Sequence, residues 1–268
     1  MSRRLVATAA VLLLAGGANG CASKHRVLAA PVVPSEEPTP VSTIVVSTGS
    51  PAPTPTSVVK TLTPEKTRTP AKLRIMPLGD SITYGLNHPD QGAYRTELGK
   101  KLAKAGVGVD FVGSMRSGPE GTDRDNEGHI GWRIGQIAAR ADEWMATYRP
   151  QVVLLHIGTN DMRSDDEALG ASDRLSALID QLLAADPKVH VVVAEIVGSD
   201  DADHDGQFQR RIDAYNALIP GLVAAKGERV HLADMHGIDG GDLADTFHPN
   251  ASGYRKMAKV WFKVLVPS

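Results

Sequence analysis

From Leu73 onward the sequence alternates between short apolar runs and segments with helical spacing, and this alternation limits the fold more than any other feature. The run QVVLLHIGT, residues 151–159, is almost uninterrupted in its apolar character, as is typical of a parallel strand covered on both faces. In residues 135–148 apolar side chains recur every three or four positions, the spacing of an amphipathic helix. Strand and helix alternate about five times, which predicts an α/β fold: a three-layer α/β/α sandwich around a parallel sheet of about five strands.

The expected elements follow from these patterns. Strands are predicted at 73–79, 109–114, 151–159, 188–198 and 229–235, and helices at 92–106, 135–148, 172–186, 208–227 and 250–265. The helix over 208–227 should bend near Pro220, because proline lacks the backbone N–H that continues a helix. The folded domain is therefore expected to cover residues 72–268.

The first 21 residues have the pattern of a signal peptide. Arg3 and Arg4 precede the uncharged run LVATAAVLLLAGGANG, which ends in small residues. This run is too short and too rich in alanine and glycine for a good membrane span. We therefore expect export, with the mature protein secreted or anchored at the cell envelope.

Cys21, the single cysteine of the chain, lies where the apolar run ends. One cysteine excludes an intramolecular disulfide. Two interpretations of it remain open. In a bacterial lipoprotein this residue becomes the lipidated N-terminus, which would tether the protein to a membrane. Alternatively, an ordinary signal peptidase cuts beside an incidental cysteine.

Residues 22–71 form a predicted linker. They are rich in proline, threonine and serine, and nine of the chain's 17 prolines lie between residues 30 and 70. Such a segment stays extended and cannot bury a core. It would hold the folded domain away from a membrane or wall layer.

The bulk composition narrows the class of ligand. With 22% charged residues, a net charge of −2 and no basic stripe with interleaved aromatic residues, the chain lacks the features of a nucleic-acid-binding protein. Aromatic residues make up only 4%, so a large aromatic platform for sugars is not expected. The same scarcity argues against a large aromatic lipid funnel, although a few well-placed rings could still contact a ligand.

Polar residues follow the predicted strands, where open parallel sheets bind their ligands. Ser81 comes after the first strand in GDS, Gly131 follows the second across a long loop in NEGHIGWR, and Asn160 follows the central strand in GTND. Asp245 and His248 lie before the last helix, in ADTFHPNASGY. We expect these four loops to meet on one rim of the sheet.

Acyl transfer requires this set of groups. A serine hydroxyl is a poor nucleophile without a base within hydrogen-bond reach, and a histidine oriented by a carboxylate serves as that base. Asp245 and His248 are three residues apart, so that one turn brings the carboxylate to the imidazole. The oxyanion of the tetrahedral intermediate needs N–H donors, which the backbone of Ser81, the backbone of Gly131 and the side-chain amide of Asn160 can supply.

The four blocks, in this order, resemble those of the SGNH hydrolase superfamily, the GDSL-like esterases. The segments IMPLGDSITYG, YRTEL, VDFVGSMRSGP, DNEGHIGWRI and HIGTND are most similar to carbohydrate esterase family three, whose members deacetylate xylan. The resemblance covers residues 73–265 and implies a flavodoxin-like SGNH fold. It implies that Ser81 is the nucleophile, His248 the base, Asp245 its partner, and Ser81, Gly131 and Asn160 the oxyanion hole.

Several of these residues also have structural interpretations. A serine after a strand is a common helix N-cap, and this alternative applies to Ser81. Asp80 and Asp161 are interpreted as structural, and His129 and His156 as packed or hydrogen-bonded. Trp132 and Arg133 follow Gly131, and two interpretations of these side chains are open. They line the substrate site, or Trp132 is a core anchor and Arg133 a solvated residue on a helix.

The segment DDADHDG, residues 200–206, contains half of a calcium-loop pattern. Asp201, Asp203 and Asp205 precede Gly206 with the alternating spacing of that motif, but its twelfth position is Ile212 instead of glutamate. A weak Ca²⁺ site and a solvated acidic loop are both compatible with this pattern. No histidine, cysteine and carboxylate set has convincing zinc spacing, so we expect no cofactor and no catalytic metal.

The sequence therefore predicts a monomeric serine esterase that removes small acyl groups, acetyl above all, from a carbohydrate. Two alternatives remain: a lipid esterase or thioesterase on the same scaffold, and a non-catalytic, carbohydrate-binding protein of the envelope.

Overall fold

The computed structural model describes residues 72–200 and 205–267. The predicted signal peptide, Cys21, the linker, and Asp201 and Asp203 of the acidic loop lie outside the described residues. Asp205 is described and exposed, and its backbone carbonyl accepts a hydrogen bond from Arg210. Within the described ranges no helix is both long enough and apolar enough to span a bilayer.

The described residues form a largely parallel sheet of seven strands. These are β1 (Leu73–Gly79), β2 (Val109–Phe111), β3 (Met115–Arg116), β4 (Asp125–Gly128), β5 (Val152–His156), β6 (His190–Ala194) and β7 (Val230–Ala233). The order is β3-β4-β1-β5-β6-β7, and β2 pairs with β1 on the edge that β4 also uses. β2 pairs with residues 73–75 and β4 with residues 78–79 of β1. β2 and β4 therefore occupy the same position beside β1, one after the other along its length. With β1, β5, β6 and β7, this gives five parallel positions across the sheet, and β3 pairs antiparallel with β4.

Successive residues of the central strands face opposite sides of the sheet, as the pleat requires. In β5, Val153 and Leu155 pack into one apolar cluster, while Val152 and Leu154 pack into the other. Both faces are thus buried. This explains why the sequences of the central strands are continuous apolar runs, in which apolar and polar residues do not alternate.

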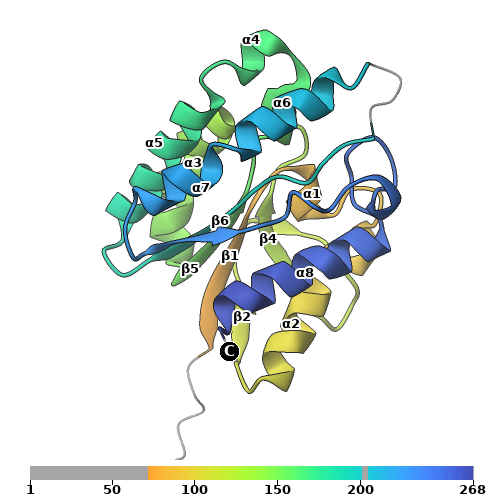
Figure 1. The fold of residues 1–268 in the computed structure, drawn as a ribbon. Helices are drawn as coiled ribbons and strands as arrows, with labels where there is room; N and C mark the ends of the chain where they lie inside the picture. Colours follow the sequence, from red (N-terminus) through yellow and green to blue (C-terminus); the bar gives the residue numbers. More distant parts are fainter. Residues whose placement is uncertain (1–71, 201–204, 268) are drawn as a thin grey trace, which may run out of the picture. The chain divides into compact units, whose positions relative to one another are not determined.

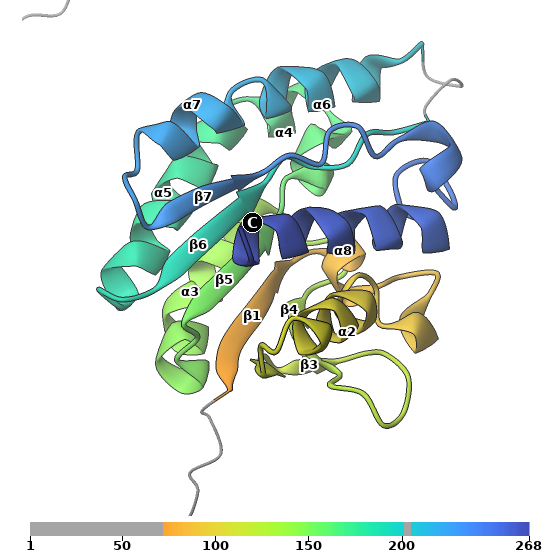
Figure 2. The same cartoon turned by 60° about the horizontal axis from the view of Figure 1, so that its bottom comes forward.

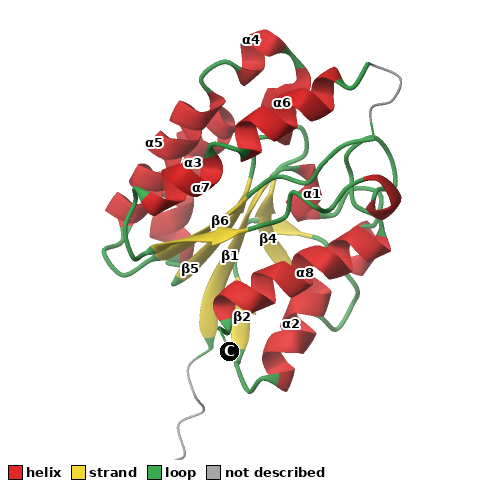
Figure 3. Ribbon diagram, in the orientation of Figure 1, coloured by secondary structure: helices red, strands yellow, loops and turns green. Residues whose placement is uncertain are grey.

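Helices cover the two faces as separate layers (Figure 1). One face carries α2 (Arg95–Lys104) and α8 (Ala251–Leu265), which pack against each other. The other carries α3 (Ile134–Tyr148), α5 (Ala171–Ala185), α6 (Gln207–Asn216) and α7 (Ile219–Ala224). Figures 2 and 3 show the sheet enclosed between these layers. The α/β/α sandwich expected from the sequence is confirmed.

Some elements differ from the sequence-based expectation. The helix expected over 208–227 is two helices, α6 and α7, with Pro220 in the first turn of α7, where a missing N–H costs nothing. β3 and β4 were not predicted, because DNEG contains no apolar residue. The short helices α1 (Ser81–Tyr84) and α4 (Asp165–Ala168), with the 3₁₀ turns η1 (Pro89–Gln91), η2 (Thr159–Arg163) and η4 (Gly240–Asp242), lie in segments expected to be loops.

Candidate active site

The predicted site residues lie where the chain changes direction across the sheet. Ser81 follows β1, Gly131 follows β4 and Asn160 follows β5, and these three strands are neighbours. From β1 the chain continues to one edge of the sheet through β2 to β4, and then crosses to β5 on the other side. This arrangement is a topological switch point, the place where open α/β sheets bind ligands.

Ser81 is the first residue of the short helix α1. The preceding residue, Asp80, is the N-cap, and its Oδ1 accepts a hydrogen bond of 2.9 Å from the backbone N–H of Ile82. The cap interpretation of Ser81 is therefore wrong, because Asp80 performs that role. The hydroxyl of Ser81 is left available for another partner.

That partner is His248. The Oγ of Ser81 lies 2.9 Å from Nε2 of His248, and Nδ1 of His248 lies 2.8 Å and 3.0 Å from the two carboxylate oxygens of Asp245. Both Ser81 and His248 are buried. The fold thus connects a hydroxyl, an imidazole and a carboxylate from two loops that are 167 residues apart in sequence.

The carboxylate of Asp245 is oriented by several donors. Its Oδ1 accepts hydrogen bonds from the backbone N–H of Phe247 (3.1 Å) and His248 (2.8 Å), and its Oδ2 accepts one from Nδ2 of Asn87 (2.7 Å). Burial alone would raise the pKa of Asp245. The donors outweigh it, and together they hold this pKa below the ordinary value. Sequence reasoning missed Asn87, because nothing in its local sequence marks it.

Three N–H groups, one on each of the loops after β1, β4 and β5, remain available to a ligand. Among the described residues, the backbone N–H groups of Ser81 and Gly131 donate no hydrogen bond. The side-chain amide of Asn160 uses one N–H to donate to the carbonyl of Trp132 at 3.0 Å. This bond links the loops after β4 and β5 and leaves the second amide proton of Asn160 unpaired among the described residues.

Trp132 and Arg133, which follow Gly131, differ in how deeply they are buried. Trp132 is half-buried against the core and stacks on His129, with ring centroids 4.2 Å apart. His129 is packed as expected, and its Nε2 lies 2.7 Å from Oε1 of Glu127. Arg133 is exposed and forms an ion pair with Glu167. Arg133 is the N-cap residue of α3, and its Nε donates to the carbonyl of Asn160 at 3.4 Å.

Asp161 has the structural role expected of it. Its Oδ2 accepts a hydrogen bond of 3.1 Å from the backbone N–H of Ile134, at the start of α3, and its Oδ1 pairs with Arg174 at 3.0 Å. A carboxylate at a helix N-terminus is favourable. Asp161 therefore fixes the loop after β5 against the start of α3.

The carboxyl group of Asp80 is fully buried beside Ser81. Burial raises its pKa to about 7, a second contribution in the same direction comes from Asp161, and the Ile82 N–H opposes both. Its Oδ2 has no hydrogen-bond partner among the described residues. At neutral pH about half of the Asp80 carboxyl groups are therefore uncharged, and the side chain supports the nucleophile loop through its bond to Ile82.

Two further buried polar residues support the site. The guanidinium of Arg95 donates to the carbonyl of Thr83 in α1 and to that of Ser117 at 2.7 Å. His156 ends β5 and is fully buried, which lowers its pKa to about 4. It is therefore neutral and packed, as predicted.

A second group of titratable side chains lies after β6 and β7. Glu195, Asp234 and His236 bring one ligand atom each to within 4.8 Å of one another. His236 Nδ1 already contacts Asp234 (2.7 Å) and Glu195 (3.3 Å). These contacts satisfy the three side chains among themselves, so the arrangement is explained without a cation.

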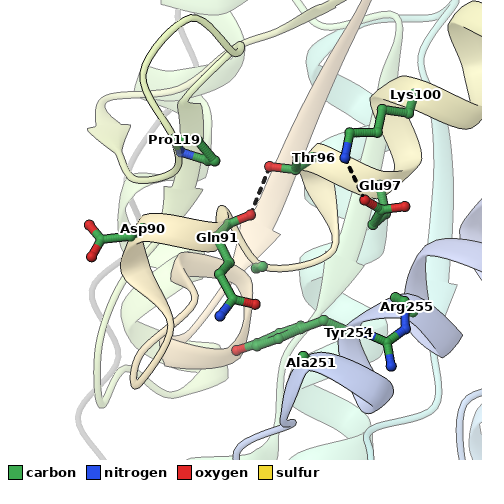
Figure 4. Close-up of a pocket in the computed structure, with 10 residues that line it drawn as sticks. Asp90, Gln91, Thr96, Glu97, Lys100, Pro119, Ala251, Tyr254 and Arg255 are labelled. Carbon is green, nitrogen blue, oxygen red and sulfur yellow. Dashed lines mark hydrogen bonds and ion pairs between the residues drawn. The ribbon is translucent and has the colours of Figure 1, made fainter.

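A separate hollow of about 250 Å³ lies between α2, η1 and the start of α8 (Figure 4). Its wall includes the ion pair between Lys100 and Glu97 and the hydrogen bond from Thr96 to the carbonyl of Gln91. Neither Ser81 nor His248 lines it. The hollow is therefore distinct from the arrangement around Ser81.

The fold and these four loops define a hydrolase of the SGNH type. A family model described as the GDSL-like Lipase/Acylhydrolase family matches residues 78–256. The chain therefore belongs to the GDSL-like lipase/acylhydrolase family.

Solved structures give the same result. The family 3 carbohydrate esterase of Clostridium thermocellum is 38% identical, with a TM-score of 0.63 over 72% of this chain and 95% of that one. A carbohydrate esterase of family 3 from Talaromyces cellulolyticus is 29% identical, with a TM-score of 0.62 over 71% and 94%. The resemblance to carbohydrate esterase family three is therefore confirmed.

Curated relatives are longer than the matched region. A "Multidomain esterase" of Ruminococcus flavefaciens is 35% identical over 225 residues, which are 71% of this chain and 28% of the relative. A "Putative endoglucanase X" of Acetivibrio thermocellus is 32% identical over 140 residues, 50% of this chain and 58% of the relative. This chain thus matches only part of each relative's length.

Proposed function

We propose that this protein is a serine esterase that hydrolyses acetyl or other small acyl esters on a carbohydrate. The observation that carries the proposal is the continuous hydrogen-bonded series from Ser81 Oγ through His248 to Asp245. The similarity to family 3 carbohydrate esterases supports a carbohydrate as the acyl carrier.

In the proposed first step, Ser81 Oγ attacks the ester carbonyl while Nε2 of His248 takes the hydroxyl proton. His248 then gives this proton to the leaving sugar oxygen, and an acyl-enzyme on Ser81 remains. In the second step His248 takes a proton from water, whose oxygen attacks the acyl carbon. The bond from this carbon to Ser81 Oγ then breaks, His248 returns the proton to Oγ, and the free carboxylic acid leaves. Asp245 holds the imidazole through Nδ1 and stabilises its charged form in both steps.

The negative charge that develops on the carbonyl oxygen needs donors that are already in place. We assign this role to the unpaired N–H groups of Ser81, Gly131 and Asn160. The hydrogen bond from Asn160 to the Trp132 carbonyl fixes the amide plane before substrate arrives, so that no reorganisation is needed in the transition state.

The test compares substrates that differ in one property at a time. We expect acetate release from acetylated xylan, and kcat/KM on 4-nitrophenyl esters that falls as the acyl chain lengthens from acetyl to octanoyl. Acetylated chitin and peptidoglycan complete the polymer panel. A preference for octanoyl would support the lipid esterase or thioesterase alternative, and no turnover on any ester would support a binding protein.

Asn87 is expected to position Asp245. Its backbone φ of 71° lies in the left-handed region, so we choose Asn87→Gly, which removes the amide without straining the backbone. The loss of one hydrogen bond to a carboxylate should lower kcat by about tenfold, corresponding to about 1.4 kcal/mol, with KM unchanged. Steady-state kinetics on 4-nitrophenyl acetate measures this split.

The matched control is Gln91→Ala. Gln91 lies in the same loop and carries the same amide, but its contact is with His88, at 3.3 Å, and not with Asp245. It should leave kcat within twofold of wild type. An equal loss of kcat in both variants would show that the loop as a whole, and not the Asn87 contact, matters.

A further inference from the structure

Arg163 lies on the same short element as Asn160. Both belong to the 3₁₀ turn η2, and they are three residues apart. Because a 3₁₀ helix has three residues per turn, side chains at i and i+3 lie above one another on the same side. Asp161, between them, points instead to the start of α3. Arg163 is therefore on the side of η2 that carries the amide of Asn160.

A ring contact links Arg163 to the residue next to His248. The guanidinium carbon of Arg163 lies 5.9 Å from the ring centroid of Phe247, a cation–π distance. The ring centroid of Phe247 lies 4.5 Å from that of His248. Arg163 is exposed, so its guanidinium faces solvent and is connected to the imidazole of His248 through the ring of Phe247.

The charge of Arg163 has no carboxylate partner within the described residues, in contrast to its neighbours. Three other arginines of this region are paired: Arg133 with Glu167, Arg174 with Asp161, and Arg211 with Asp165. Acidic side chains are thus abundant nearby, and three of them, Glu167, Asp161 and Asp165, contact an arginine other than Arg163. The exposed guanidinium keeps its N–H donors for a partner from outside.

The backbone under Arg163 is fixed by α6. Arg211 donates from Nε to the carbonyl of Met162 at 2.6 Å and from its terminal nitrogen to the carbonyl of Arg163 at 3.2 Å. Its charge is balanced by Asp165 at 3.1 Å, on the short helix α4, which packs against α6. A cation held on a rigid backbone and an aromatic ring loses little freedom when it binds a ligand.

We propose that Arg163 determines specificity by binding the carboxylate of a uronic acid unit that neighbours the acetylated sugar. The proposal rests on the esterase function proposed above and adds the substrate class. The planar guanidinium matches a carboxylate with two parallel N–H donors, and Phe247 supplies an apolar surface next to it for the sugar ring. Ester hydrolysis itself is unchanged, because Arg163 touches only the part of the substrate that does not react.

The test uses two forms of one substrate. Acetylated xylo-oligosaccharides that carry glucuronic acid are compared with the same oligosaccharides after the carboxyl group is reduced to an alcohol. Wild type should have about fivefold higher kcat/KM on the acidic form at low salt, the size of a partly exposed ion pair. This preference should decrease strongly at 0.5 M NaCl, where a screening length of a few ångströms, about 3 Å at 1 M, weakens an exposed pair.

Variants assign the preference to one side chain. Arg163→Ala should remove the preference and leave kcat/KM within twofold on the reduced form and on 4-nitrophenyl acetate. Arg163→Lys should retain part of it. The control is Arg140→Ala, which removes another exposed arginine whose guanidinium carbon lies 5.9 Å from an aromatic ring centroid, that of Trp144 on α3. It should retain the full preference.

The outcomes separate this proposal from the esterase function. Hydrolysis of both forms at equal rates by wild type would overturn the role of Arg163 and leave the esterase intact. An equal loss on both forms in Arg163→Ala would overturn it as well, because the side chain would then only support Phe247 and His248. No hydrolysis of either form, nor of any simple ester, would overturn the esterase function itself.

Discussion

Ser81→Ala should abolish ester hydrolysis while leaving the fold intact. Removal of a serine nucleophile of this kind lowers kcat by about four to six orders of magnitude, because no other group forms the acyl-enzyme. The side chain of Ser81 makes one hydrogen bond, to His248, so the loss in stability should be about 1 kcal/mol or less. Acetate release and a melting curve measure the two effects.

Activity and melting temperature must both be measured, because together they distinguish a loss of chemistry from a loss of structure. For a domain of this size about 1 kcal/mol shifts the melting temperature by roughly 2–4 °C. An inactive variant that melts within this range has lost chemistry, not structure. Activity near the wild-type level would rule out Ser81 as the nucleophile.

Gly79→Ala should cause a large loss of stability for the addition of a single methyl group. A Cβ at this position would lie 2.2 Å from the carbonyl oxygen of His156 and 2.5 Å from Oγ1 of Thr83. The first contact is with backbone, so β1 and β5 would have to separate where both strands end at the site. We expect a loss of about 3 kcal/mol, seen as a melting temperature lower by roughly 6–12 °C, together with reduced kcat.

Gly221→Ala is the matched control for Gly79→Ala. Gly221 lies in α7, and a Cβ there would meet nothing within 4 Å. Because alanine favours a helix over glycine by about 1 kcal/mol, this variant should be as stable as wild type or slightly more so. A Gly79→Ala variant that melts like wild type would contradict the close approach of β1 and β5.

Much of the fold could be predicted because the spacing of apolar residues in each segment matches the surfaces that the segment buries in the folded structure. The apolar run over 151–159 is a central strand because both of its faces are buried. The helix over 135–148 has its apolar residues on the face that packs against α5 and the sheet. β4 could not be predicted, because its residues are polar and it pairs with β1 over only two positions, Leu78 and Gly79.

The candidate site was predictable in part for a similar reason. Ser81, Asn160, Asp245 and His248 follow or precede strong elements and belong to recognisable blocks. The supporting residues were not predictable. Asn87 and Arg95 act through partners on other segments of the chain, and the ring that Arg163 contacts, Phe247, also lies on another loop. The immediate neighbours of these residues in the chain contain no sign of those partners.

The sequence alone determined the α/β class, the approximate elements and the four loops with acyl-transfer chemistry, because periodicity and motif spacing are properties of neighbouring residues. Only the tertiary structure decided that Asp80 and not Ser81 caps α1, that Asn87 orients Asp245, and that the charge of Arg163 is unpaired among the described residues. These three facts depend on distances between side chains from different segments, and such distances are set by how strands and helices pack.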